Sequence, residues 1–259
     1  MEDVQSRTDH RGIALHRAGI AGVRLPVVAM EQRTVALAEL AVSVEADTKG
    51  AHMSRFLQAL EPHRELLSLA RMPALLKAVR ETLEASSASV RFVFPYFFEK
   101  AAPVSGAKGW SDIEASLAGS IESGSCEVWL GASIPVTSLC PCSRAISDYG
   151  AHNQRGTVHI EVRPRRSGDQ LAPISLADLV AVAEAAASAP VYPVLKRPDE
   201  RHVTMQAYDN PVFVEDMARD VAGALREDPR VVAFHVRVVN EESIHNHQAF
   251  ASVSWVRDE

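Results

Sequence analysis

The segment NPVFVEDMARDVAGALREDPRVVAFHVRVVN, residues 210–240, decides the fold class. Its first half has apolar residues at helical spacing and acidic residues in its first turns, where the helix dipole favours them, so it predicts an amphipathic helix. Its last ten residues predict a strand, and the later run QAFASVSWVR (248–257) predicts an antiparallel partner for that strand. A helix followed by an antiparallel strand pair indicates an α+β protein.

The rest of the chain repeats this alternation. Further strands are predicted at GVRLPVV (22–28), TVALAELAVSVEA (34–46), ASVRFVFPYFFEKAAP (88–103), SCEVWLGASIPVTSL (125–139) and GTVHIEVRPR (156–165). Helices are predicted at MSRFLQAL (53–60), LLSLARMPALLKAVRETLEA (66–85) and SLADLVAVAEAAASA (175–189). Ser54 and Ser175 are the expected caps of the first and the last, and Pro73 should kink or divide the second. This order predicts one chain, 1–259, with two related modules, 19–137 and 138–259.

Composition narrows the class of protein. The chain has 259 residues, 47% hydrophobic, which is enough for one large domain or two fused smaller ones. Its net charge of -6 argues against a nucleic-acid partner, because such proteins need an excess of basic residues. The N-terminal residues lack the apolar core of a secretory signal and no long apolar run follows, so we expect a cytoplasmic protein without a membrane partner. Three cysteines are too few for a disulfide framework.

The stretch SLCPCSRAISDYGAHNQRG, residues 138–156, holds two of these cysteines. Pro141 fixes its own backbone and favours an extended residue before it, which predicts a rigid, non-helical bend that carries Cys140 and Cys142. His152 follows ten to twelve residues later, within reach of a loop. Thiolate and imidazole groups suit an open metal site, but a redox or structural loop remains an alternative.

Three other clusters could carry chemistry. His245 and His247 lie beside Glu242, and in an extended chain residues two apart point to one side. Glu200 is surrounded by Lys196, Arg197 and Arg201, which could be a charged surface turn or a clamp for a polyanion. A similar basic cluster contains Lys49, His52 and Arg55. Glu215 falls early in a predicted helix, where the dipole alone explains an acidic residue, although a carboxylate can also bind the edge of a base.

Five motifs together resemble those of the type IB GTP cyclohydrolases, bacterial and archaeal enzymes of the tunnelling-fold superfamily. They occur in family order, and the LCPCS…YGAHNQRG block is highly specific. The motifs are KGAHMSRF (49–56), VTSLCPCSRAISDYGAHNQRG (136–156), YPVLKRPDE (192–200), DNPVFVED (209–216) and EESIHNHQAFA (241–251). The resemblance implies a tunnelling fold of two modules, each an antiparallel sheet backed by helices, that assembles edge to edge into an oligomeric barrel. It also implies a homotetramer with active sites between subunits.

The resemblance also implies roles for single residues. Cys140, His152 and Glu200 are similar to the family's metal ligands for zinc or manganese, with Cys142 left open as the alternative thiol. Cys140, Cys142, His245 and His247 are implied at the reacting base, Glu215 at the guanine edge, and Glu242 beside a histidine. Lys49, Arg55, Lys196 and Arg197 are assigned to the triphosphate by their charge alone.

The activity implied is the hydrolysis of GTP to 7,8-dihydroneopterin triphosphate and formate, the first step of tetrahydrofolate and pterin biosynthesis. Two alternatives stay open. A related tunnelling-fold enzyme, such as a deazaguanine nitrile reductase, would use a cysteine nucleophile and a nicotinamide cofactor in place of a metal. A non-enzymatic assembly protein would use its thiols to fix a structural metal.

Overall fold

The computed structural model describes residues 5, 7–168 and 170–258. They form two compact units: the first contains the chain up to Pro95 and Ser116–Leu130, the second Tyr96–Ala115 and the chain from Gly131 onward. Three long strands contribute residues to both units, β3 (Ser87–Ala101), β4 (Lys108–Glu122) and β5 (Ser125–Leu139). The units therefore divide the chain differently from the modules 19–137 and 138–259, whose relationship stays a prediction.

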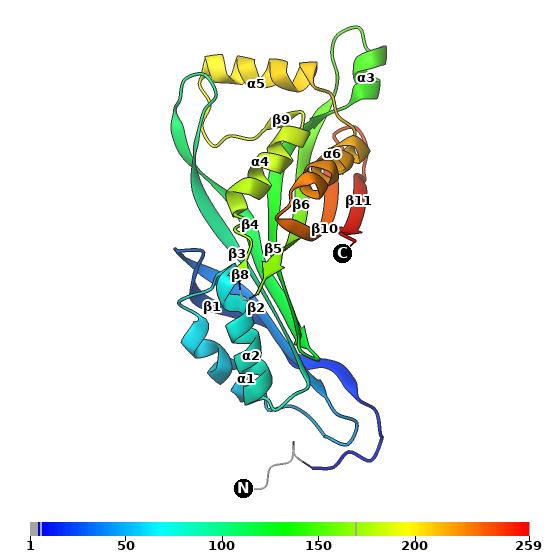
Figure 1. The fold of residues 1–259 in the computed structure, drawn as a ribbon. Coiled ribbons are helices and arrows are strands. Elements are labelled where there is room, and N and C mark those ends of the chain that lie inside the picture. Colours follow the sequence, from blue (N-terminus) through cyan, green and yellow to red (C-terminus); the bar gives the residue numbers. More distant parts are fainter. Residues whose placement is uncertain (1–4, 6, 169, 259) are drawn as a thin grey trace. The chain divides into compact units, whose positions relative to one another are not determined.

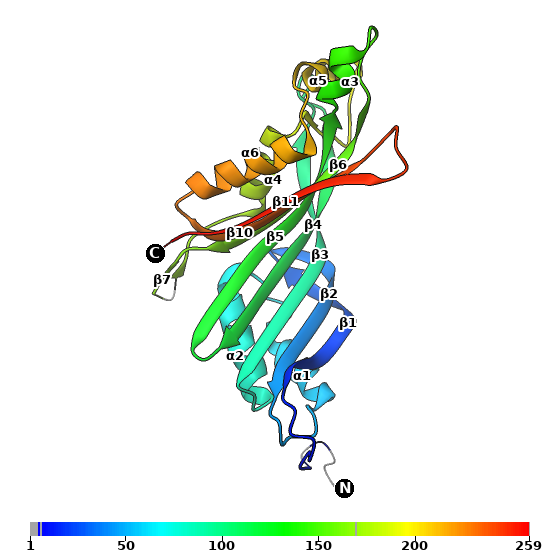
Figure 2. The same cartoon turned by 90° about the vertical axis from the view of Figure 1, so that its right-hand side faces the viewer.

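The first unit is an antiparallel sheet covered by two helices. Strands β1 (Leu15–Ala29) and β2 (Gln32–Val44) form a hairpin, and β2 pairs with β3. Helices α1 (Met53–Leu60) and α2 (Met72–Thr82) lie on one face of these strands (Figure 2). Short 3-10 helices, Glu61–His63 and Leu69–Arg71, precede α2. Large apolar side chains fill the space between helices and sheet, among them Phe56, Leu60, Leu75, Leu76 and Phe92.

Of two local expectations in this unit, the one for Ser54 was wrong and the one for Pro73 was confirmed. Helix α1 begins after His52, and Ser54 lies inside its first turn instead of capping it. Pro73 occupies the first turn of α2, and the helical residues before it belong to the separate 3-10 helix Leu69–Arg71. A proline in a first turn breaks no hydrogen bond, because the N–H that it lacks would have no partner there. The predicted helical segment is therefore divided, as expected, and Pro73 lies at the start of its second part.

The second unit has the same design with more helices. The parts of β3, β4 and β5 in this unit form one sheet with β6 (Asn153–Pro164), β10 (Val231–Glu241) and β11 (Gln248–Val256), in the order β3-β4-β5-β6-β10-β11. Strand β10 pairs antiparallel with both β6 and β11. Helices α4 (Leu176–Ala186) and α6 (Val214–Glu227) lie on one face of this sheet (Figure 1). Two further helices, α3 (Pro141–Ile146) and α5 (Arg197–Asp209), lie near its end. The short strand β9 (Ala189–Pro190) pairs with β5, and β7 (Arg166–Ser167) and β8 (Gln170–Leu171) form a separate two-stranded sheet.

The opening segment folds as its pattern predicts. On α6, Met217, Val221 and Leu225 follow each other at a spacing of four and are buried. On β10, Phe234, Val236 and Val238 are buried, whereas His235 and Arg237 between them are exposed on the other face. Ser175 and Asp178 form the expected capping box of α4, with Ser175 Oγ accepting from the Asp178 N–H at 3.2 Å.

Two elements were missed by the sequence analysis. Strand β4 is rich in glycine, serine and alanine, and Ile113 and Ile121 are its only β-branched residues, so it carries a weaker strand signal than the valine-rich strands. Helix α5 was interpreted as a charged turn because its sequence, RPDERHVTMQAYD, has few apolar residues. Only Asp199 and Ala207 of α5 are buried, so the helix has no apolar stripe wide enough to be recognised from the sequence.

His159 on β6 makes stability depend on pH. Its ring Nδ1 lies 2.9 Å from Ser133 Oγ; burial and Arg237 lower the pKa of His159 below its usual value of 6.5, outweighing the opposing effect of Glu114 and Glu161. The folded state thus favours the neutral ring, and this stability is present above about pH 6.5 and lost as the pH falls below it. Between about pH 7.5 and pH 5.5, we expect the melting temperature of His159→Gln to fall less than that of the wild type. Parallel pH curves for the two proteins would contradict this expectation.

Candidate active site

Cys140 lies at the junction of β5 and α3. Its backbone is extended, with φ -72° and ψ 118°, as expected for a residue before proline. The expected non-helical bend was wrong beyond this point, because Pro141 opens α3 and Cys142 lies in its first turn. Cys140 is half-buried and its Sγ accepts a hydrogen bond from the Ser143 N–H at 3.5 Å, whereas Cys142 is exposed. Both thiols are free.

His152 lies next to Cys140, although twelve residues separate them in the sequence. The Cys140 N–H donates to the His152 carbonyl at 3.1 Å, and the His152 N–H donates to Ser143 Oγ at 3.2 Å. His152 Nδ1 lies 2.9 Å from Gln154 Oε1 and 3.3 Å from Ser243 Oγ. The other ring nitrogen, Nε2, has no hydrogen-bond partner in the described chain. Cys140 and His152 are therefore neighbours through their backbones, and the His152 ring keeps one nitrogen without a partner in the described chain.

Glu200 is in the first turn of α5 and does not join this pair. Its carboxylate is exposed and has no hydrogen-bond or ion-pair partner among the described residues. Val203 and Ala207, which share a helix face with Glu200, pack in a small apolar cluster with Leu139 and Ala151, the residues just before Cys140 and His152. Over residues 5, 7–168 and 170–258, no three His, Cys, Asp or Glu side chains are arranged so as to hold a metal ion.

Asp199, beside Glu200, anchors the start of α5. This carboxylate is 0% exposed and accepts hydrogen bonds from the Val104 N–H (2.8 Å), the Ser105 N–H (2.7 Å), Ser105 Oγ (2.6 Å) and the Lys196 N–H (2.9 Å). Burial alone would raise the pKa of Asp199, but these hydrogen bonds outweigh it and hold the pKa well below its usual range. The side chain therefore ties the turn between β3 and β4 to the first turn of α5.

We expect Asp199→Asn to lower the melting temperature by roughly 5 °C or more. The amide group places an N–H where the carboxylate accepts, so at least one of the two donors at Oδ2, Ser105 Oγ and the Lys196 N–H, loses its acceptor. Thermal unfolding followed by circular dichroism checks this. Asp216→Asn serves as the control, because that carboxylate is exposed and should change the melting temperature little. Equal melting temperatures for Asp199→Asn and the wild type would contradict the anchoring role.

The loop between β10 and β11 carries the histidine pair. The rings of His245 and His247 are stacked, with centroids 5.0 Å apart and an interplanar angle of 16°. The loop consists of bends and not of the extended chain that we expected, yet the two rings do lie together. Ser243 of the same loop contacts His152, which connects the histidine pair to the Cys140–His152 pair. Glu242 is half-buried and makes no hydrogen bond to either ring in the described chain.

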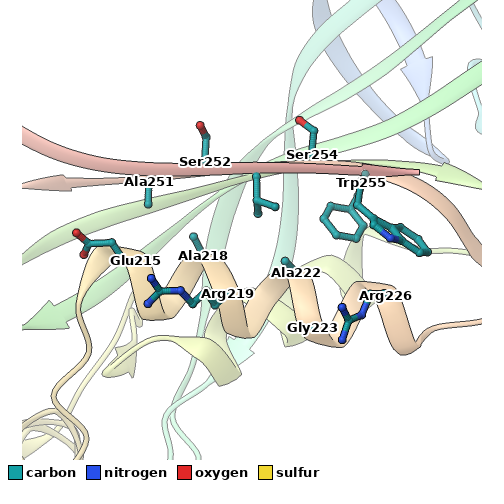
Figure 3. Close-up of a pocket in the computed structure, with 12 residues that line it drawn as sticks. Glu215, Ala218, Arg219, Ala222, Gly223, Arg226, Ala251, Ser252, Ser254 and Trp255 are labelled. Atoms are coloured by element: carbon teal, nitrogen blue, oxygen red, sulfur yellow. The ribbon is translucent and has the colours of Figure 1, made fainter. Parts of the chain in front are cut away.

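Glu215 faces a cavity of about 570 Å³ between α6 and β11. Figure 3 shows its carboxylate near Ala251 at one end and Arg226 with Trp255 at the other. Arg219 also lines this cavity. Glu215, Arg219 and Arg226 are spaced by four and seven residues, so the helical period places them on one face. The sequence analysis overlooked the two arginines, although this spacing could have identified them.

The four basic candidates are distributed over both units. Lys196 and Arg197 stand at the start of α5 in the second unit. Lys49 and Arg55 belong to the first unit, and the Arg55 guanidinium is 3.4 Å from the Glu84 carboxylate. Of these candidates, Lys196 and Arg197 at the exposed start of α5 are nearest in sequence to Glu200.

Residues 1–251 match the family model described as type I GTP cyclohydrolase folE2. The chain belongs to this family. GTP cyclohydrolase FolE2 of Methylococcus capsulatus is 45% identical over 258 residues, covering 98% of this chain and 94% of that protein. GTP cyclohydrolase FolE2 of Ralstonia nicotianae is 46% identical over 257 residues, again covering 98% of this chain and 94% of that protein.

Solved structures support the fold of this FolE2 family member. The uricase from Arthrobacter globiformis matches with a TM-score of 0.53 and 11% identity, and the match covers 94% of each chain. Urate oxidase from Bacillus sp. TB-90 matches with a TM-score of 0.52 and 7% identity, over 94% of this chain and 100% of that one. These likenesses confirm the tunnelling fold. None of the described helices is long and apolar enough to cross a membrane.

Proposed function

We propose that this chain is a metal-dependent GTP cyclohydrolase that converts GTP and water to 7,8-dihydroneopterin triphosphate and formate. The observation that carries the proposal is the meeting of Cys140, His152 and the β10–β11 loop at the end of β5, in a chain of the FolE2 family. The loop contacts His152 through Ser243 and carries two further histidines, His245 and His247, which supports the proposal. The family match does not favour the nitrile reductase or the non-enzymatic alternative.

The donors at this place suit zinc or manganese. Cys140 offers a thiol, and His152 offers Nε2 while Nδ1 is engaged with Gln154. We propose Glu200 as the third ligand, because its carboxylate is free and it shares a helix face with Val203, which packs against the same apolar cluster as Ala151. Mixed sulfur, nitrogen and oxygen ligands are typical of catalytic zinc sites. A bound divalent ion would supply Lewis acidity and an activated water for attack on C8 of guanine.

The chain's own residues would bind the base and move protons. The Glu215 carboxylate faces its cavity and can accept two hydrogen bonds from N1–H and the 2-amino group of guanine. His245 and His247 can exchange protons with the purine imidazole ring as it opens and formate leaves. Cys142 is exposed one residue beyond Pro141, and we place it near the base without a ligand role.

The remaining contacts and the assembly are also proposals. Lys196 and Arg197 would bind the triphosphate, together with Lys49 and Arg55, because their charges complement it. A homotetramer joined through sheet edges would complete the sites, since β1 and β11 each have one edge without a partner strand in the described chain. The free thiols suit the reducing cytoplasm.

A turnover assay tests the activity. Purified full-length protein is incubated with GTP and Mn²⁺ or Zn²⁺, and the product is oxidised to a fluorescent pterin. We expect the fluorescent pterin and formate in equal amounts, because each GTP that is converted gives one pterin and one formate. Metal-loaded protein that binds GTP but forms neither product would contradict the proposal.

A further inference from the structure

A buried hydrogen-bond network lies next to His152. Gln154 is 8% exposed, and its Oε1 lies 2.9 Å from His152 Nδ1 while its Nε2 donates to Ser138 Oγ at 3.4 Å. Ser138, 1% exposed, also receives a hydrogen bond from Asn240 Nδ2 at 3.0 Å and donates to the Val212 carbonyl at 3.1 Å. The network joins the ends of β5, β6 and β10 to the segment before α6.

The chemistry of the partners fixes the direction of every hydrogen bond. The Val212 carbonyl can only accept, so the Ser138 hydroxyl must donate to it. The Ser138 oxygen then accepts from two amide groups, those of Gln154 and Asn240, which uses both of its lone pairs. Because the amide nitrogen of Gln154 faces Ser138, its oxygen faces His152 and accepts from Nδ1–H. The neutral ring of His152 is therefore held with its lone pair on Nε2.

The chain keeps this network at a cost. Asn240 is 2% exposed, and its Oδ1 is buried without a hydrogen-bond partner in the described chain. A Cβ at Gly156 would lie 2.7 Å from that oxygen, so a larger residue at Gly156 would force Asn240 to move. An unpaired buried carbonyl is unfavourable, and packing the same space with apolar side chains would avoid it. Asn240 thus donates its amide nitrogen to Ser138 and leaves its oxygen unpaired.

We propose that Gln154, held by Ser138, is a positioning residue for the metal centre. It keeps the His152 ring in the tautomer and orientation that present Nε2 to a metal ion. The inference rests on the proposed function, because it takes His152 to be a ligand. Hydrogen bonds to the second nitrogen of a ligating histidine typically change metal affinity by about 10- to 100-fold when they are removed.

The test compares two substitutions at Gln154. Gln154→Leu removes the nearer acceptor for Nδ1–H with little change in volume and leaves only Ser243 Oγ, at 3.3 Å, so we expect Zn²⁺ affinity to fall by about 10- to 100-fold. Gln154→Glu keeps an acceptor for Nδ1–H, although it cannot donate to Ser138 Oγ, and we expect it to lose less Zn²⁺ affinity than Gln154→Leu, since carboxylates also orient ligating histidines. Affinity is measured by competition with a chromophoric chelator on metal-free, full-length protein, and thermal unfolding is recorded in parallel.

Ser188→Ala is the matched control. Ser188 is 0% exposed and its Oγ accepts from the Leu139 N–H at 3.0 Å, so it supports the end of the same strand from outside the network. We expect this variant to unfold at a lower temperature but to bind Zn²⁺ like the wild type. A loss of affinity equal to that of Gln154→Leu would show that general loosening, and not the hydrogen bond to His152, lowers metal affinity, and would overturn the inference.

The outcomes separate this inference from the proposed function. Wild-type Zn²⁺ affinity in Gln154→Leu, or equal losses in Gln154→Leu and Gln154→Glu, would overturn the positioning role. A loss of Zn²⁺ affinity in His152→Ala would still support the role of His152 as a ligand. Wild-type affinity in His152→Ala would overturn the ligand set itself, and the positioning role with it. If Gln154→Leu does not fold, Ser138→Ala replaces it, with several-fold weaker Zn²⁺ binding expected and wild-type binding as the contradicting result.

Discussion

Replacing Cys140 or His152 by alanine is expected to remove the bound metal and to lower GTP turnover by about a thousandfold or more. A metal ion contributes several kcal/mol of transition-state stabilisation to hydrolysis, and about 4 kcal/mol corresponds to this factor. The backbones of the two residues are joined by the hydrogen bond from the Cys140 N–H to the His152 carbonyl, which neither substitution removes, so each variant should leave the other metal ligand in place. Metal content by elemental analysis and pterin formation are measured on the same samples.

The cysteines of this chain provide matched controls. Cys126→Ser changes a half-buried thiol near the start of β5, outside the proposed site, and should keep both metal and turnover. Cys142→Ser distinguishes the two thiols of the motif, and we expect it to keep the metal, because Cys142 is exposed on α3 while Cys140 adjoins His152. Stoichiometric metal in both Cys140→Ala and His152→Ala would refute the ligand assignment.

The second large effect is expected at Glu215. Gln in its place can accept only one of the two hydrogen bonds that a carboxylate accepts from the guanine edge, and it carries no charge. Hydrogen bonds to charged groups are worth about 1.5–3 kcal/mol, so kcat/KM for GTP should fall by roughly 100-fold. Metal content should not change, because Glu215 lines the cavity beside β11 and is not a proposed ligand.

A nucleotide analogue makes this prediction specific. Inosine triphosphate lacks the 2-amino group, so the wild type should prefer GTP strongly, and Glu215→Gln should prefer it much less. Asp216→Asn is the control, since Asp216 lies in the same turn of α6 but pairs with Arg219 at 3.0 Å. An unchanged preference for GTP in Glu215→Gln would show that another group recognises the guanine edge.

Much of the fold was predictable because local sequence patterns determine its helices and strands. The valine-rich alternation of β10 and the spacing of Met217, Val221 and Leu225 on α6 each identify a buried face within a few residues. The capping box of α4 is equally local. Strand β4 and helix α5 were missed because their sequences carry little such signal, and α5 instead depends on the buried contact of Asp199 with the turn before β4.

The candidate site was predictable only in part, for a related reason. Cys140 and His152 lie in one motif, so loop length alone makes their approach reasonable. Gln154, Ser138 and Asn240 come from three different strands, and their network exists only because the sheet brings those strands together. Ser138 and Gln154 belong to the same motif as Cys140, but no spacing within that motif could indicate the contact with Asn240.

The most direct measurement is GTP turnover by one preparation before and after its metal is removed and restored. We predict that chelation abolishes the release of formate and of 7,8-dihydroneopterin triphosphate while the protein stays folded, and that one equivalent of Zn²⁺ or Mn²⁺ per chain restores both. Full turnover by metal-free protein, or no turnover by protein that has bound its metal, would contradict the account.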